Sequence, residues 1–347
     1  GIAAGKNHGV AKNANVYFVK VSGLEGSGDS GTGISVTDCF DVIKGWHNNK
    51  TDNIETGVPN PTVVNMSWGY LRTFTNAQIS NINYRGTDYS GTDIDTTTER
   101  ENNYGLMYSL YSASGPTYAS NLRIASVDTD IEELLEAGVH VFVAAGNRSN
   151  KVDESGGTDY DNNYTHTSSG TTYYHRGSSP YGDAGQDGTG PRAIIVGNMD
   201  SSVHDTTTDR KATSSETGPG VDIYAPGTNV MSATSNTNRF TDGAYYLNSS
   251  FRECNISGTS MASPQVAGVA ACILELYPQW TPSQLKQWLL DNAGSAILNT
   301  GTGNDWTNDR SLKGGSPKVL HLPFTSPEPA KISGFDNLTF NIKIKEQ

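Results

Sequence analysis

Short apolar runs alternate with segments of helical periodicity along most of the chain. The runs at 62–66, 139–145 and 193–196 consist mainly of apolar residues, which is typical of strands buried on both faces of a parallel sheet. Residues 35–49 and 128–137 instead carry apolar side chains at helical spacing. This alternation predicts an α/β fold with a mostly parallel central sheet and helices on both faces.

Further elements are predicted near the two ends of this pattern. Residues 15–21 have the composition of a buried strand, and a glycine-rich segment at 23–33 follows them. A long, small and apolar helix is predicted to begin near Ser260, and its composition indicates that it is buried. The Thr-Pro-Ser-Gln sequence at 281–284 opens another helix with a capping-box pattern.

Two long polar segments interrupt the alternation. Residues 70–125 and 148–190 are rich in Thr, Asn, Ser, Asp and Tyr, so we expect surface insertions with little core of their own. After residue 318 the pattern changes to short β-like runs with prolines. The sequence therefore predicts one domain at 1–317 that carries both insertions, and a small β-rich extension or arm at 318–347.

Composition and charge exclude several classes of protein. The chain has 347 residues, with 24 Lys and Arg against 36 Asp and Glu, so its formal net charge is −12. The electrostatic field of this negative charge repels phosphate backbones and anionic membranes, so nucleic acid is excluded as a partner. The longest apolar stretch, near 266–276, is too short to span a bilayer. The chain has three cysteines: Cys39, Cys254 and Cys272. They are too few for a disulfide framework, although one disulfide bridge with one free thiol is compatible with the sequence.

The most informative motif is Gly-Thr-Ser-Met-Ala-Ser-Pro at 258–264. Gly258 allows a close approach of the backbone to a ligand, and Pro264 falls in the first helical turn, where its missing N–H costs little. Ser260 lies where the helix begins, at the positive end of the helix dipole, where a backbone N–H can receive an oxyanion. These residues fit a nucleophile, and they fit a simple N-cap equally well.

This motif resembles the nucleophile segment of subtilisin-like serine peptidases, in the style of proteinase K. Further segments resemble the same family in the same chain order, and together they cover most of residues 1–292 apart from the two insertions. They are the Gly-Val-Ala-Lys-Asn-Ala segment at 9–21, Val-Val-Asn-Met-Ser-Trp-Gly at 63–69, Val-Ala-Ala-Gly-Asn at 143–147, Ile-Val-Gly-Asn-Met-Asp at 195–200 and Val-Asp-Ile-Tyr-Ala-Pro-Gly-Thr at 221–228.

The resemblance implies a serine endopeptidase whose substrate is a peptide or protein. Ser260 would attack the scissile carbonyl to form an acyl-enzyme, and Asn147 would donate its side-chain amide to the oxyanion. Taken alone, Asn147 is also compatible with a turn residue at a strand end, and Trp68 with a core residue. The resemblance further implies that two segments bind the substrate backbone: Ser67, Trp68 and Gly69, and Ala144, Ala145 and Gly146.

The family also needs a general-base histidine and an orienting aspartate, both ahead of the serine in chain order. None of the seven histidines here lies in the required motif, so we expect an N-terminal fragment upstream of Gly1 to carry both residues. No cofactor is required for this chemistry. The alternative is a catalytically inactive interaction protein that keeps the fold. The resemblance implies an extracellular or secreted protein; attachment to a larger assembly through the C-terminal extension, on a virion or cell surface, is the alternative.

A structural calcium site is also implied by the resemblance. Asp222 with the carbonyl groups of Pro191 and Ala193 would supply oxygen ligands, which suit calcium. The alternative is that Asp222 only caps local backbone.

Overall fold

The structure is a computed structural model. It describes residues 1–20, 35–75, 78–106, 108–109, 117–174, 176–178, 180–181, 192–200, 209–235, 243–295 and 310–322. The glycine-rich segment at 23–33, Pro191 and most of the predicted C-terminal extension lie outside these residues.

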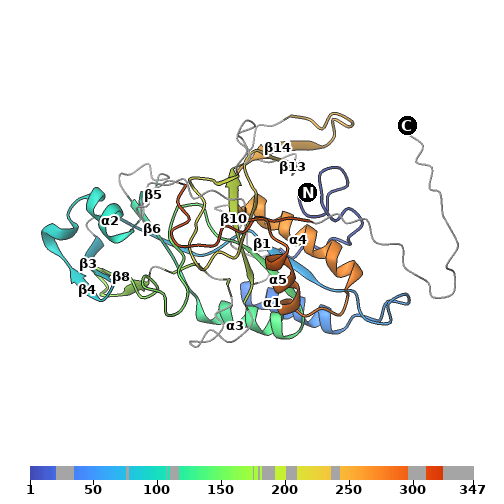
Figure 1. The fold of residues 1–347 in the computed structure, drawn as a ribbon, viewed down its shortest axis with the longest axis horizontal. Helices are drawn as coiled ribbons and strands as arrows, with labels where there is room; N and C mark the ends of the chain where they lie inside the picture. Colours follow the sequence, from blue (N-terminus) through green and yellow to red (C-terminus); the bar gives the residue numbers. More distant parts are fainter. Residues whose placement is uncertain are drawn as a thin grey trace.

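A mostly parallel sheet forms the centre of the molecule (Figure 1). Strand β7 (His140–Ala144) lies between β1 (Val63–Met66) and β10 (Ile194–Asp200), and β12 (Ile223–Pro226) also pairs with β10; all these pairs are parallel. The short β11 (Arg210–Lys211) is antiparallel to β10. The predicted α/β fold with a mostly parallel sheet is therefore confirmed.

Helices cover both faces of this sheet. Helices α1 (Val36–Asn48) and α3 (Ala125–Glu136) pack against each other over one face. Helix α4 (Thr259–Leu276) lies on the other face against β1, β7, β10 and β12, and α5 (Pro282–Asp291) follows it. The capping box predicted for α5 is present, since Thr281 and Gln284 each accept a hydrogen bond from the other's backbone N–H.

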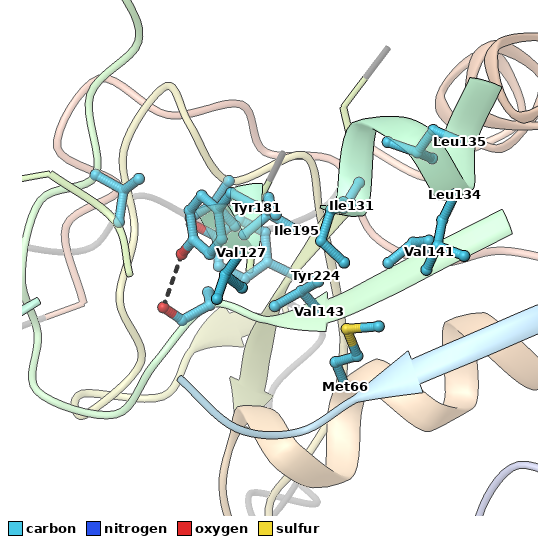
Figure 2. Packing of buried hydrophobic residues seen from close by; sticks show 14 of the residues in the cluster. Met66, Val127, Ile131, Leu134, Leu135, Val141, Val143, Tyr181, Ile195 and Tyr224 are labelled. Carbon is cyan, nitrogen blue, oxygen red and sulfur yellow. Dashed lines mark hydrogen bonds between the residues drawn. The ribbon is translucent and has the colours of Figure 1, made fainter. Parts of the chain in front are cut away.

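Alternation along β7 divides the core into two clusters, one on each face. Val141 and Val143 belong to the cluster beneath α1 and α3, while Phe142 belongs to the cluster beneath α4. Figure 2 shows the first cluster, in which Ile131 and Leu134 of α3 lie over the strands. A strand buried on both faces needs apolar residues at successive positions, which explains the nearly continuous apolar run in the sequence.

The described strands of the two insertions, with the helices between them, form one body with its own core, which we call the satellite body (residues 71–75, 78–106, 108–109, 117–121 and 163–174). One sheet holds β2 (Leu71–Thr75), β6 (Thr117–Asn121) and β5 (Tyr108–Ser109). In the other, β3 (Ile79–Tyr84) of the first insertion pairs with β8 (Asn163–His166) of the second. This sheet is completed by β4 (Thr87–Tyr89) and β9 (Thr172–Tyr174), while η2 (Gly91–Ile94) and α2 (Thr97–Tyr104) lie between β4 and β5 in the chain; these elements lie at the left of Figure 1.

The expectation of insertions with little core was therefore wrong. Eight buried residues form a cluster here: Phe74, Ile79, Ile82, Ile94, Tyr104, Leu106, Tyr118 and Tyr164. Seven of these eight residues lie in the first insertion, but their spacing follows neither a strand nor a helix period, and the tyrosines among them are indistinguishable by pattern from surface tyrosines. Of the eight, Tyr164 alone comes from the second insertion, and the pairing of β8 with β3 brings it to this cluster.

A conservative deletion tests whether this satellite core contributes to stability. Ile82→Val is expected to lower the free energy of unfolding by about 1 kcal/mol, since it removes one methylene from a buried side chain. Ile54→Val is the matched control, because Ile54 is 99% exposed. Urea denaturation measures both variants, and equal effects of the two substitutions would show that the satellite core is not packed as described.

The predicted buried strand at 15–21 is not formed over the part that the structure describes. Residues 15–20 lie outside any strand, and Phe18 is 91% exposed. Tyr17 instead packs on Trp46 of α1, with ring centroids 4.8 Å apart. An apolar segment forms a strand only where it pairs with another strand, and here Tyr17 contacts helix α1 instead.

One further hairpin and the state of the three cysteines complete the description of the fold. Strands β13 (Val230–Thr234) and β14 (Arg252–Ile256) pair in antiparallel fashion. All three cysteines are free, which excludes a disulfide in this structure. Among the described residues, no helix is both long and apolar enough to cross a membrane.

Candidate active site

Ser260 lies in the first turn of α4, next to the end of β1. The helix begins at Thr259 with Gly258 as its N-cap, so the interpretation of Ser260 as a simple N-cap is wrong. The Ser260 hydroxyl donates to the Ser67 carbonyl oxygen at 3.4 Å, and the Ser67 hydroxyl donates to the Ser260 carbonyl oxygen at 3.0 Å. This pair of contacts holds the segment after β1 against the start of α4.

Asn147 follows β7, and its side chain is fixed by Thr259. Asn147 Oδ1 accepts hydrogen bonds from the Thr259 backbone N–H at 2.9 Å and from the Thr259 hydroxyl at 3.1 Å. The Gly146 N–H in turn donates to Thr259 Oγ1 at 3.1 Å. Because two donors converge on Oδ1, the amide oxygen is assigned to this side and the NH₂ end faces away from Thr259.

Glycine is required at the N-cap of α4 because of this arrangement. Gly258 has φ 151°, a backbone conformation that other residues rarely adopt. A Cβ atom at this position would lie 3.3 Å from Asn147 Oδ1 and 3.4 Å from Nδ2. The glycine of the nucleophile motif thus lets the Asn147 amide come up against the residues that precede Ser260.

The candidate substrate-binding residues lie beside this pair. Ser67 and Gly69 follow β1, while the half-buried Trp68 packs near Phe40 and edge-on against Tyr70. Trp68 therefore contributes to the core, which was one of its two interpretations. On the neighbouring strand the predicted set is Ala144, Ala145 and Gly146.

The side chains of this second segment face the interior. Ala145 is fully buried, and its carbonyl accepts a hydrogen bond from the Tyr181 hydroxyl at 3.0 Å, the dashed line in Figure 2. The Ala145 N–H donates to the Val196 carbonyl oxygen of β10. The backbone N–H and carbonyl groups of Ala145 and Gly146 thus form hydrogen bonds within the protein.

A buried acid, Glu216, lies directly against this segment, and the sequence did not point to it. Glu216 is fully buried, and its N–H donates to the Gly146 carbonyl oxygen at 2.9 Å. Its carboxylate accepts hydrogen bonds from the side-chain amides of Asn121 at 2.9 Å and Asn150 at 3.3 Å. Burial raises the pKa of Glu216 to about 7, although these hydrogen bonds and the charges of Arg148 and Lys313 oppose the shift. A glutamate in a polar stretch is usually solvated, so the pattern carried no signal for it.

The histidines do not supply a general base within the described residues. His8 pairs with Glu253 at 3.0 Å, His47 bonds the Thr62 hydroxyl, and His140 is buried at the start of β7. In the described part of the chain, no histidine nitrogen forms a hydrogen bond with Ser260. His175 and His204 lie outside the described residues.

The predicted calcium ligand Asp222 is already engaged by protein groups. Asp222 Oδ2 accepts a hydrogen bond from the Ile195 N–H at 2.8 Å, and Oδ1 lies 2.8 Å from Lys286 Nζ. A carboxylate that neutralises an ammonium group does not fit a cation in this arrangement. Ala193, directly before β10, is fully buried. The described residues contain no group of three or more His, Cys, Asp or Glu able to hold a metal.

Comparison with known proteins supplies the family. The model of the subtilase family, Peptidase_S8, matches residues 1–316. The subtilisin-like protease SBT3.9 of Arabidopsis thaliana is 35% identical over 103 residues, which are 30% of this chain and 12% of that protein. SBT2.6 of the same plant is 45% identical over 69 residues, 20% of this chain and 8% of that protein. The chain thus spans only about an eighth or less of the curated relatives it matches.

Two solved structures are also similar. A cold adapted subtilisin-like serine proteinase has a TM-score of 0.48 and 21% identity, covering 92% of this chain and 71% of its own. A protease from Pseudoalteromonas arctica has a TM-score of 0.45 and 19% identity, covering 90% and 62%.

Fold and site together define an α/β protein with a candidate serine nucleophile at the carboxyl end of a parallel sheet. The chain belongs to the subtilase family, since the family model matches nearly its whole length. This finding confirms the resemblance to subtilisin-like serine peptidases that the motifs indicated.

Proposed function

We propose that the protein is a serine endopeptidase in which Ser260 forms the acyl-enzyme and Asn147 stabilises the oxyanion. The supporting observation is the pair of hydrogen bonds from Thr259, the residue before Ser260, which fixes the orientation of the Asn147 amide. A tetrahedral intermediate needs preorganised donors where its negative charge develops, and the Asn147 NH₂ group and the Ser260 N–H supply two. Ser67 to Gly69 would then pair with the substrate backbone, and Ala144 to Gly146 would line the site beside it.

Activation of Ser260 requires a base, because a serine hydroxyl is a weak nucleophile near neutral pH. We assign that base and its orienting aspartate to a partner fragment that carries both residues. On this proposal the enzyme acts outside the cell on peptides or proteins; attachment to a larger assembly through the C-terminal extension is the alternative. The absence of a histidine bonded to Ser260 in the described chain favours the second candidate, an inactive protein that keeps the fold.

Active-site labelling distinguishes the two candidates. A fluorophosphonate probe is expected to label the native preparation at Ser260, identified by peptide mass, because the probe requires an activated serine beside oxyanion donors. Ser260→Ala should abolish labelling. Ser263→Ala should retain it, because Ser263, in the next turn of α4, is fully buried and its hydroxyl donates a hydrogen bond to Asn65 Oδ1. Folded native protein that is not labelled supports the inactive alternative.

A further inference from the structure

Glu216 has no role in the proposed chemistry, yet it is built into the turn that carries Asn147. A Cβ atom added to Gly146 would lie 2.4 to 2.6 Å from the Glu216 carboxyl group, so only glycine allows the acid to lie against this peptide. The Glu216 N–H also binds the Gly146 carbonyl. Main chain and side chain of one buried residue thus contact the residue that precedes Asn147.

The carboxyl group also ties together three parts of the chain. Asn121 ends β6 of the satellite body and donates to Glu216 Oε2, while Asn150 donates to Oε1 from the far side of the turn. The turn of residues 146–150 is therefore held at its beginning through Gly146 and at its end through Asn150. From Gly146 the contacts continue through Thr259 to the Asn147 amide.

We propose that Glu216 is a positioning residue for oxyanion stabilisation: its buried carboxyl group clamps the 146–150 turn and thereby sets the Asn147 amide beside Ser260. This inference rests on the proposed function of Asn147. It extends that function to a residue that touches neither the substrate nor the nucleophile.

The clamp is sensitive to protonation because of its surroundings. In the described structure both carboxyl oxygens accept a hydrogen bond, which suits the ionised form. Asn150 Oδ1 is buried and finds no hydrogen-bond partner among the described residues. Protonation converts one carboxyl oxygen into a donor, and the Asn150 amide would turn over to accept from it. The turn that carries Asn147 would then change its hydrogen bonds.

Titration of the clamp falls in the range where peptidases are assayed. Burial raises the Glu216 pKa to about 7, and the cations of Arg148 and Lys313 limit the rise. Other charged or titratable groups lie around it: Lys313 Nζ donates to the Ser149 carbonyl, and Lys211 Nζ donates to the Ser215 carbonyl at 3.1 Å. Tyr181, whose pKa burial raises far above its usual value, adds no charge.

Two measurements on the native protein test the proposal, with Glu216→Ala and Glu216→Gln as variants. Glu133→Gln is the matched control, because Glu133 is a surface carboxylate of α3 that pairs with Lys44. Hydrogen exchange of peptides covering 145–151 should accelerate about tenfold or more in Glu216→Ala and should not change in the control. Unchanged exchange in Glu216→Ala overturns the clamp.

The second measurement is the ratio of kcat/KM for Glu216→Gln to that of the wild type against pH. The glutamine keeps an acceptor but never ionises, so the ratio should fall about three- to tenfold between about pH 6 and about pH 8.5. Titration of a catalytic histidine cancels in this ratio. A ratio that stays constant with pH, despite faster exchange in Glu216→Ala, reduces Glu216 to a structural role and overturns the proposal. A wild type inert to substrate and probe overturns the proposed function instead, and the exchange result still decides whether the clamp exists.

Discussion

Replacing Asn147 with alanine is expected to lower kcat by about 100- to 1000-fold, with little change in KM. The scale is that of losing one oxyanion donor in subtilisin itself. An interaction made mainly in the transition state affects kcat, whereas uniform binding affects KM. Steady-state kinetics on a chromogenic peptide measures both constants in the native protein.

Alanine also removes the acceptor for both Thr259 donors, so a second variant separates folding from catalysis. Asn147→Asp keeps oxygen acceptors for the Thr259 N–H and hydroxyl but has no N–H to donate. It should be impaired as severely as the alanine variant while it folds normally. Asn49→Ala, at the end of α1 on the opposite face of the sheet, is the control and should retain wild-type kinetics. An aspartate variant within about threefold of wild type would show that Asn147 is not an oxyanion donor.

Acidification is expected to destabilise the protein through His140. Burial lowers the pKa of His140 from 6.5 to about 4, with a further contribution from nearby His47 and an opposing hydrogen bond to the Trp280 carbonyl. The unfolded chain then binds the proton more readily than the folded one. Stability is therefore lost as pH falls from 6.5 to about 4, by about 3 kcal/mol in total for this group.

Glu216 acts in the opposite direction over much of the same range. Its folded pKa of about 7 lies above its ordinary value of 4.5, so its contribution to stability falls as pH rises between these values. The two groups partly offset each other in the wild type. The variant His140→Gln should remove the acid-dependent loss and expose the slope due to Glu216.

Denaturant unfolding of wild type and His140→Gln at a series of pH values measures this effect. The difference in unfolding free energy should change by about 3 kcal/mol between pH 6.5 and pH 4. His8→Gln is the control, because the His8 side chain is 41% exposed and pairs at the surface with Glu253. A pH-independent difference for His140→Gln would mean that His140 is not buried as the neutral form.

The sequence predicted the parts of the fold that local pattern determines. Strands β7 and β10 appear as apolar runs because both of their faces are buried, and α5 is marked by its capping box. The pairing of β3 with β8 could not be predicted, because it joins segments about eighty residues apart that lack apolar periodicity. The exposure of Phe18 was missed for the converse reason, since apolar composition does not specify a partner.

The residues of the candidate site likewise fall into two groups: those that a local motif identifies and those that only tertiary contacts reveal. Ser260 and Asn147 lie in short motifs whose letters carry the chemistry, so the sequence alone pointed to them. Glu216 reaches Gly146 only through the folded chain, and Asp222 is held by Lys286 of a helix far along the sequence. Tertiary contacts of this kind decide whether a carboxylate binds a cation, a proton or a backbone amide, and local sequence does not record them.

The most direct test of the account is a crystal structure of the native protein after reaction with a fluorophosphonate. The account predicts a bond from Ser260 Oγ to phosphorus, with the phosphoryl oxygen about 2.7 to 3.1 Å from both Asn147 Nδ2 and the Ser260 backbone nitrogen. A phosphoryl oxygen turned to solvent, or an adduct on another residue, would contradict it.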